Sequence, residues 1–199
     1  HIVNIEYGLI EKNAKRQGQS IEELAREYRY EAIEETMGSI NADYVALGHT
    51  LDDQLETLIM RFFQGSGVHG LEGIPEIRGS IIRPIISIQK DSLLEYLDIK
   101  NLSYSTDKTN NHSIYLRNKI RLELIPVIAD IFPGFKGSLV NFAKKAKYVN
   151  AVLDKNTNNK YLNKTDNGIP WFSWNVFKDL SAYEQSELIY KSWDLWKEK

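Results

Sequence analysis

Cysteine is absent from all 199 residues of the chain. Its absence excludes disulfide bonds, cysteine nucleophiles, thiolate zinc sites and iron–sulfur clusters carried by this chain. Long apolar runs are also missing, because none approaches the roughly 20 residues that span a bilayer. The formal net charge is only −2, so any contact with nucleic acid would depend on local basic patches. These absences favour a cytoplasmic protein with no membrane partner.

Composition places the chain among ordinary globular proteins, with 42% hydrophobic and 26% charged residues. A chain of this length forms one large domain or two smaller ones. Composition shifts predict three consecutive segments. Residues 1–130 would form a first domain, residues 131–165 a basic helical linker and loop, and residues 166–199 the start of a small, tryptophan-rich second domain. The tryptophans of this last segment are read as core rather than as base-stacking platforms.

Strand-like and helix-like patterns alternate in the first 130 residues. Strands or extended runs are predicted over residues 1–7, 44–48 and 81–86, with a polar loop over 8–19. Helices are predicted over residues 20–37, 51–63, 90–97 and 114–124, the first stopped by Gly38 and the last near Pro126. Alternation of this kind predicts an α/β fold with a parallel, Rossmann-like sheet.

The segment Gly48-His49-Thr50-Leu51-Asp52-Asp53-Gln54-Leu55-Glu56-Thr57 joins a predicted strand to a predicted helix. In open α/β sheets, ligands bind outside the carboxyl ends of strands, where such junctions lie. One interpretation is structural: Thr50 caps the helix and Asp53 completes a capping box. The other is chemical: Asp52, Asp53 and Glu56 crowd one side of the helix, which favours a bound cation such as Mg²⁺ or a substrate ammonium.

His49, at the end of the strand, is a candidate phosphate contact or acid–base group, or a loop histidine bonded to backbone. The glycine-rich segment over residues 64–73 also has two interpretations. Gly65 ends the helix and turns follow, or amides near Gly65 and Gly67 approach phosphate. No Gly-Lys-Ser/Thr follows these glycines, so the segment is not a Walker A loop.

Three groups of basic residues are candidate anion contacts. Arg26 and Arg29 lie three residues apart on a predicted helix, where guanidinium forks suit phosphate or carboxylate. Arg117 and Arg121 are neighbours at i, i+4. The third group is a lysine cluster that would meet nucleic-acid backbone, formed by Lys144, Lys145 and Lys147. For each group the alternative is a solvated or ion-paired helix face.

Taken together and in this order, the motifs resemble the tRNA(Ile)-lysidine synthetases over about residues 1–150. The segments that carry the resemblance are Ser20-Ile-Glu-Glu-Leu-Ala-Arg26-Glu-Tyr-Arg29-Tyr30, the 48–57 junction, Arg61 with Gly65-Ser66-Gly67 and Gly70-Leu71, Arg83-Pro84, Asp107-Lys-Thr-Asn110, and Arg117-Asn118-Lys-Ile-Arg121. The resemblance implies an N-type PP-loop ATPase with an adenine-nucleotide α-hydrolase-like sheet. It also implies two substrates, free L-lysine and a tRNA(Ile) with a CAU anticodon. ATP would adenylate the C2 oxygen of the wobble cytidine, C34, and the lysine ε-amine would then displace AMP to give lysidine.

The resemblance also implies roles for individual residues. The catalytic set would be Asp53, Glu56, His49 and Arg29, with Mg²⁺ on Asp52 and Asp53. Substrates would be bound by Arg26, Asp52, Arg117, Asn118, Arg121, Gly65 and Gly67. Contacts with tRNA would come from Arg83, Lys144, Lys145 and Lys147. A homodimer is left open.

One departure from the family concerns its nucleotide loop, Ser-Gly-Gly-x-Asp-Ser, which does not occur here. The expected domain is therefore incomplete at its N-terminus, and the chain alone would be inactive if that loop is required. The last residues also stop within a helical pattern. Two alternatives stay open: another PP-loop tRNA-modifying enzyme, although the thiolases of that kind use cysteines, and a non-catalytic tRNA-binding fragment.

Overall fold

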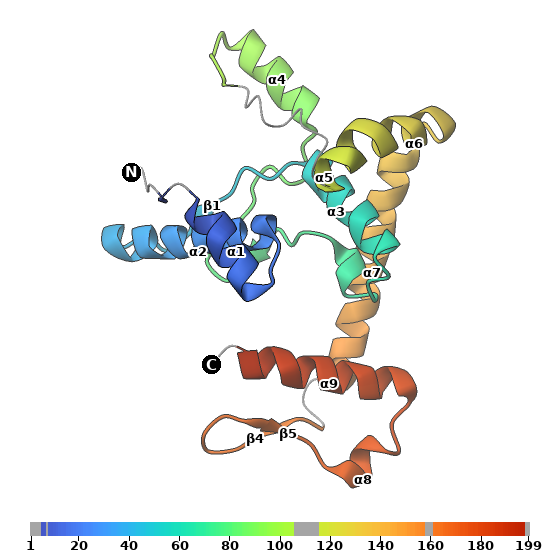
Figure 1. Ribbon diagram of the computed structural model, residues 1–199. Helices are drawn as coiled ribbons and strands as arrows, with labels where there is room; N and C mark the ends of the chain where they lie inside the picture. Colours follow the sequence, from blue (N-terminus) through green and yellow to red (C-terminus); the bar gives the residue numbers. More distant parts are fainter. Residues whose placement is uncertain (1–4, 7, 106–115, 158–160, 198–199) are drawn as a thin grey trace. The chain divides into compact units, whose positions relative to one another are not determined.

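A computed structural model describes residues 5–6, 8–105, 116–157 and 161–197 (Figure 1). The predicted strand over residues 1–7 lies mostly outside these ranges. The chain divides into two compact units, one formed by residues 1–54 with 74–105 and the other by residues 55–73 with 106–199. The three consecutive segments expected from composition remain a prediction. None of the helices within the described ranges is long and apolar enough to cross a membrane.

The first unit begins with a pair of packed helices, α1 (Leu9–Gln17) and α2 (Ile21–Ile40). The prediction of a polar loop over residues 8–19 is wrong, because most of that segment forms α1. Burial and one hydrogen bond stabilise helix α1. Ala14 is buried at 2% exposure, and Asn13 Nδ2 donates to the hydroxyl of Tyr28 at 2.8 Å. Gly18 joins the helices in a left-handed conformation (φ 68°), which glycine adopts at little cost.

Helix α2 starts where the sequence predicts. The hydroxyl of Ser20 accepts a hydrogen bond from the Glu23 amide at 3.1 Å, which is half of a capping box. Its end lies three residues beyond the predicted end, because the helix continues through Gly38 to Ile40. Asn41 then takes the left-handed conformation (φ 49°) and ends the helix.

A three-stranded sheet in the order β1-β3-β2 forms the centre of the first unit. Strand β1 (Val45–Ala46) pairs parallel with β3 (Ile81–Ile82), as a Rossmann-like sheet requires. Strand β2 (Ile77–Arg78) pairs antiparallel with β3, so the expectation of a wholly parallel sheet is corrected. Gly79, with φ 58°, allows the tight turn between β2 and β3.

The extended run predicted over residues 81–86 ends early. Turns follow Pro84, marked by amide-to-carbonyl bonds from Ile86 to Arg83 (3.2 Å) and from Ile88 to Ile85 (3.0 Å). Helix α4 (Lys90–Ile99) comes next and runs two residues past its predicted end.

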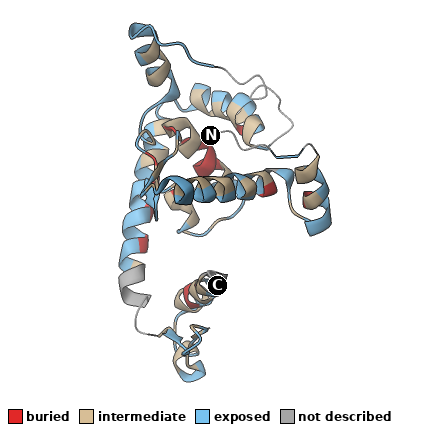
Figure 2. Cartoon of the chain, turned by 90° about the vertical axis from the view of Figure 1, so that its left-hand side faces the viewer, coloured by how far each residue is buried: buried red, intermediate tan, exposed pale blue. Residues whose placement is uncertain are grey.

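Helix α3 (Leu51–Phe63) has the bounds that the sequence predicts. Gly65 (φ 73°) follows its end, and the amide of Ser66 bonds the carbonyl of Arg61 at 2.9 Å, as in a Schellman cap. The core of the second unit forms around three buried side chains, Ile59, Ile120 and Phe135. Figure 2 shows how sparse the buried positions are along the helices.

The predicted helix over residues 114–124 begins outside the described ranges and does not stop near Pro126. Helix α5 (Leu116–Lys119) continues through a π-helical turn, η3 (Ile120–Leu124), into α6 (Ile125–Ile131). Proline lacks an N–H and its ring crowds the carbonyl four residues earlier. A π turn, with its i→i+5 bonding, relieves that conflict, so the helix passes the proline.

Helix α7 (Phe135–Thr157) confirms the predicted basic helix and extends it. The loop expected at the end of the 131–165 segment lies partly outside the described ranges and contains strand β4 (Asn163–Lys164). This strand pairs antiparallel with β5 (Pro170–Trp171). Two helices follow, the short α8 (Trp174–Phe177) and α9 (Ala182–Lys197), which packs against both β5 and α7.

The tryptophans of the last segment are not core residues. The exposed fractions are 49% for Trp171, 70% for Trp174, 53% for Trp193 and 55% for Trp196. Trp193 and Trp196 stack on each other with ring centroids 5.3 Å apart. The prediction that they are buried is therefore wrong, because β5 and the described faces of α8 and α9 leave half of each ring uncovered.

Candidate active site

The junction between β1 and α3 is built by its own side chains. The Asp53 carboxylate accepts hydrogen bonds through Oδ2 from the Thr50 amide at 2.8 Å and from the Thr50 hydroxyl at 3.0 Å. These bonds satisfy donors at the start of α3, and the carboxylate lies at the positive end of the helix dipole. The Asp53 half of the predicted capping box is thereby confirmed, and it leaves open a chemical role for the same carboxylate.

Asp52, one position earlier, reaches another helix start. Its Oδ2 accepts the amide of Lys90, the first residue of α4, at 2.7 Å. The carboxylate therefore fixes α4 to the junction within the first unit. Across the described ranges, no group of three or more acidic or histidine side chains could hold a metal ion. Binding of Mg²⁺ by Asp52 and Asp53 remains a prediction.

His49 lies against Arg83, whose side chain is buried at 2% exposure. Arg83 Nε lies 3.3 Å from His49 Nδ1, and Arg83 Nη1 donates to the carbonyl of Pro75 at 2.8 Å. A guanidinium only donates, so Nδ1 accepts, which places the proton of a neutral His49 on Nε2. Arg83 thus orients the ring, and its burial disfavours the predicted direct contact with tRNA.

Among the described charged residues of the second unit, Glu56 is the most buried, at 1% exposure. Arg117 Nε contacts its Oε2 at 2.7 Å, and Arg121 reaches both oxygens, with Nε 2.5 Å from Oε1 and Nη2 3.1 Å from Oε2. The two arginine side chains keep 35% and 32% exposure. Glu56 therefore holds two partly exposed guanidinium groups side by side, with the half-buried Asn118 between them in sequence.

The predicted arginine pair of α2 is exposed and lies against aromatic and apolar neighbours. Arg26 Nη2 donates to the hydroxyl of Tyr30 at 3.2 Å, and its guanidinium carbon lies 4.9 Å from the Tyr30 ring centroid. Arg29 lines an apolar pocket of about 550 Å³ with residues of α1 and α2. Binding of phosphate by either arginine remains a prediction.

The glycine-rich segment over residues 64–73 is held from within by a residue of α3. Arg61 Nη1 donates to the carbonyls of Gly70 (2.9 Å) and Gly73 (2.8 Å). On the other side, the buried Asn150 of α7 donates through Nδ2 to Glu72 Oε1 at 2.5 Å. Asn150 was missed by the sequence analysis, because one asparagine on a basic helix carries no local signal of a partner 78 residues away.

Gly70, in the short 3₁₀ helix η1 (Gly70–Glu72), leaves no room for a side chain. A Cβ added there would lie 2.6 Å from the Ser66 Cβ. We expect Gly70→Ala to lower the free energy of unfolding by about 1–3 kcal/mol, the usual cost of overpacking. Adding Ser66→Gly should restore most of that loss in urea denaturation. A double variant no more stable than Gly70→Ala would exclude this contact as the cause.

The predicted tRNA-contacting lysines, Lys144, Lys145 and Lys147, are all exposed on α7.

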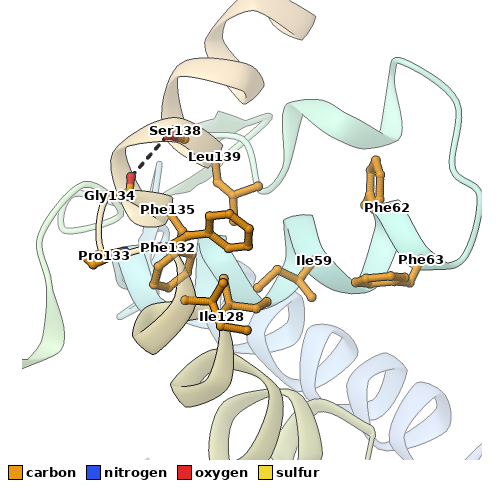
Figure 3. Close-up of a pocket in the computed structure, with 11 residues that line it drawn as sticks. Ile59, Phe62, Phe63, Ile128, Phe132, Pro133, Gly134, Phe135, Ser138 and Leu139 are labelled. Atoms are coloured by element: carbon orange, nitrogen blue, oxygen red, sulfur yellow. Dashed lines mark hydrogen bonds between the residues drawn. The ribbon is translucent and has the colours of Figure 1, made fainter.

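A pocket of about 590 Å³ in the same unit is lined almost wholly by apolar side chains of α3, α6 and the start of α7 (Figure 3). Phe62 and Phe63 face it from α3, and the hydrogen bond drawn there joins the Ser138 hydroxyl to the Gly134 carbonyl at 3.2 Å. With no ionisable side chain in its lining, this pocket has no acid–base chemistry.

Comparison with known families identifies the class of this protein. The family described as PP-loop domain matches residues 2–128, more than half of the chain, and the chain belongs to that family. The predicted α/β, Rossmann-like class follows from this membership, and the parallel β1–β3 pair agrees with it.

Curated relatives are similar over most of the chain. A protein of Borreliella afzelii (strain PKo) is 37% identical over 184 residues, covering 92% of this chain and 41% of the relative. Proteins of Clostridioides difficile (strain 630) and Clostridium perfringens (strain 13 / Type A) are 40% and 44% identical, over 76% and 73% of the chain. Each is named tRNA(Ile)-lysidine synthase. The chain spans at most 41% of the length of these relatives.

Proposed function

We propose that this chain is part of an enzyme that ligates lysine to C2 of the wobble cytidine in a CAU-anticodon tRNA(Ile). The observation that carries the proposal is the similarity over 92% of the chain to a protein named tRNA(Ile)-lysidine synthase. The PP-loop family membership supports ATP as the activating substrate. A cytoplasmic location and a homodimer remain predictions.

The reaction needs two transfers. In the first, the C2 oxygen of cytidine attacks the α-phosphorus of ATP, and pyrophosphate leaves. In the second, the lysine ε-amine attacks C2, AMP leaves, and the nitrogen loses a proton. Cations stabilise the leaving phosphates, and a base near the amine takes the proton.

Within the first unit, Asp53 and His49 are the proposed acid–base groups, and Arg26 and Arg29 the proposed phosphate contacts. The oxygen donors of Asp52 and Asp53 suit Mg²⁺, which needs one or two carboxylates besides nucleotide phosphates. When bound, the ion would neutralise phosphate charge.

Glu56 has a different proposed task. Both of its oxygens are occupied by Arg117 and Arg121, so it orients these guanidinium groups. Their exposed edges would bind the α-carboxylate of lysine or the tRNA backbone, since a guanidinium fork matches either anion. This role replaces the expectation that Glu56 itself is a catalytic residue.

Ligation is tested with radiolabelled lysine, ATP and a CAU-anticodon tRNA(Ile) transcript, using the product of the complete reading frame that encodes this chain. The 199 residues alone lack the Ser-Gly-Gly-x-Asp-Ser loop. Label retained on the tRNA supports the proposal. Bound tRNA without label would favour the alternative of a non-catalytic RNA-binding module, for which the exposed lysines of α7 are the main argument.

We expect Asp53→Asn to lower lysine incorporation by about 100-fold, because an amide cannot take up the amine proton. The asparagine side chain still accepts a hydrogen bond at the helix start, so the free energy of unfolding should change by less than about 1 kcal/mol. Asp43→Asn, at an exposed position just before β1, is the matched control. Full activity in Asp53→Asn would reduce Asp53 to a helix cap.

A further inference from the structure

A polar cleft of about 560 Å³ lies within the second unit. Its walls include Gly65 and Gly67, whose substrate contacts remain a prediction. One wall is the backbone and small side chains of residues 65–70, and the other is the α9 face that carries Glu187, Tyr190 and Lys191. The first wall is pre-formed, because Arg61 bonds the carbonyls of Gly70 and Gly73, and Asn150 bonds Glu72. Glycines at positions 65, 67 and 70 allow a ligand to approach the backbone closely.

A buried carboxylate orients a histidine in this cleft. Glu187 Oε2 lies 2.7 Å from His69 Nε2, and the exposed fractions of the two side chains are 10% and 41%. Within the described part of the chain, no partner is found for the other ring nitrogen, Nδ1. A histidine held in this way presents one polar atom to a ligand hydroxyl group, with its ring orientation fixed by the carboxylate.

Aromatic and basic residues line the cleft and are also found elsewhere on α9 and on α7. Tyr190 is 67% exposed, and the stacked pair Trp193 and Trp196 continues along the same helix. Lys191 adds positive charge to the cleft lining. Helix α7, which packs against α9, carries the exposed lysines Lys144, Lys145 and Lys147. Stacking surfaces beside cations are the usual features of sites for unpaired nucleic acid.

We infer that this cleft binds one unpaired nucleotide of the RNA substrate, a contact separate from the reacting cytidine. The inference rests on the proposed function for the presence of RNA. The base stacks on Tyr190, Lys191 lies near the phosphate, and the oriented His69 bonds the ribose 2′-hydroxyl. RNA is favoured over a free mononucleotide because the aromatic rings and the lysines extend beyond the cleft, as a polymer would require. The 2′-hydroxyl contact predicts discrimination against DNA.

The test uses the product of the complete reading frame that encodes this chain, and measures its binding to a fluorescein-labelled, single-stranded oligoribonucleotide by anisotropy. Tyr190→Ala should weaken binding about tenfold, because stacking on one aromatic ring contributes about 1–3 kcal/mol. Tyr190→Phe retains the ring and should bind like the unaltered protein. Tyr96→Ala, which removes an exposed tyrosine of α4, is the control.

Two further measurements sharpen the assignment. His69→Phe should bind RNA and a DNA oligonucleotide of the same sequence equally well, whereas the unaltered protein should prefer RNA. AMP is offered separately, and AMP binding that depends on Tyr190, with RNA binding unchanged in Tyr190→Ala, would overturn the inference in favour of a mononucleotide site. Equal RNA affinity of Tyr190→Ala and the unaltered protein would also overturn it.

Failure of this inference can be told apart from failure of the proposed function. If lysine incorporation is normal and Tyr190→Ala binds RNA as tightly as the unaltered protein does, only the cleft assignment is refuted. Loss of RNA binding in Tyr190→Ala, in a protein that never incorporates lysine, refutes the ligase proposal and supports the cleft. Far-UV circular dichroism of each variant checks folding, which substitution of an exposed tyrosine should not affect.

Discussion

Glu56→Gln is expected to lower the free energy of unfolding by about 3 kcal/mol, near the lower end of the range for breaking a buried ion pair. The glutamine removes the charge that Arg117 and Arg121 share, and its amide nitrogen opposes their N–H donors. The side chain is 1% exposed, so water cannot replace the lost acceptor. The loss stays near 3 kcal/mol because both arginines are about one-third exposed and can turn towards solvent.

The measurement is urea denaturation followed by far-UV circular dichroism. Glu123→Gln is the matched control, because Glu123 is an exposed glutamate in the same π-helical turn as Arg121. It should change the midpoint little, as exposed charges usually do. Similar midpoints for Glu56→Gln and Glu123→Gln would show that the Glu56 pair contributes no net stability. In the ligation assay, Glu56→Gln should also raise the KM for lysine if Arg117 and Arg121 bind its carboxylate.

Arg83→Ala is the second substitution with a large expected effect. The side chain is 2% exposed and donates to Pro75 and His49. Removing it deletes the hydrogen bonds from the guanidinium to the Pro75 carbonyl and to His49 Nδ1. Hydrogen bonds to charged groups contribute about 1.5–3 kcal/mol each. We expect the free energy of unfolding to fall by about 3 kcal/mol, again measured by urea denaturation.

Arg78→Ala is the control for this substitution, because Arg78 lies exposed on the neighbouring strand β2. Arg83→Lys separates charge from geometry, since an ammonium keeps the charge but lacks the planar fork. If Arg83→Lys is as stable as the unaltered chain, the fork is not required. If Arg83→Ala weakens only tRNA binding and leaves stability unchanged, the original expectation of a tRNA contact is restored.

Locally encoded elements could be predicted from the sequence. The bounds of α3 were correct because Thr50 and Asp53 start it and Gly65 ends it, all within a few residues of the helix. The start of α2 at Ser20 is specified in the same way. Helix α1 was missed because its stability depends on Tyr28 and the burial of Ala14, and neither contact is visible in an exposed-looking polar pattern.

The sequence predicted which residues belong to the candidate site, but not which of them contact one another. Glu56, Arg117 and Arg121 were each candidates, yet their direct pairing spans 61 and 65 residues and has no local signature. Gln54 shows the same difficulty, since it bonds the backbone of Ile74 through both side-chain atoms, at 2.5 Å and 3.2 Å. Contacts of this range depend on how the chain folds back, which a periodic pattern does not encode.

The four indoles, confined between Trp171 and Trp196, make the intrinsic emission of this protein a regional reporter. Because each ring is about half exposed or more, its emission maximum should respond to whatever covers it, while events around Glu56 or Arg83 should leave the signal unchanged. A ligand that occupies the α9 face should quench or blue-shift this light without any added label. Tryptophan fluorescence therefore reports on the segment from Trp171 to Trp196, whereas circular dichroism reports on the folding of the whole chain.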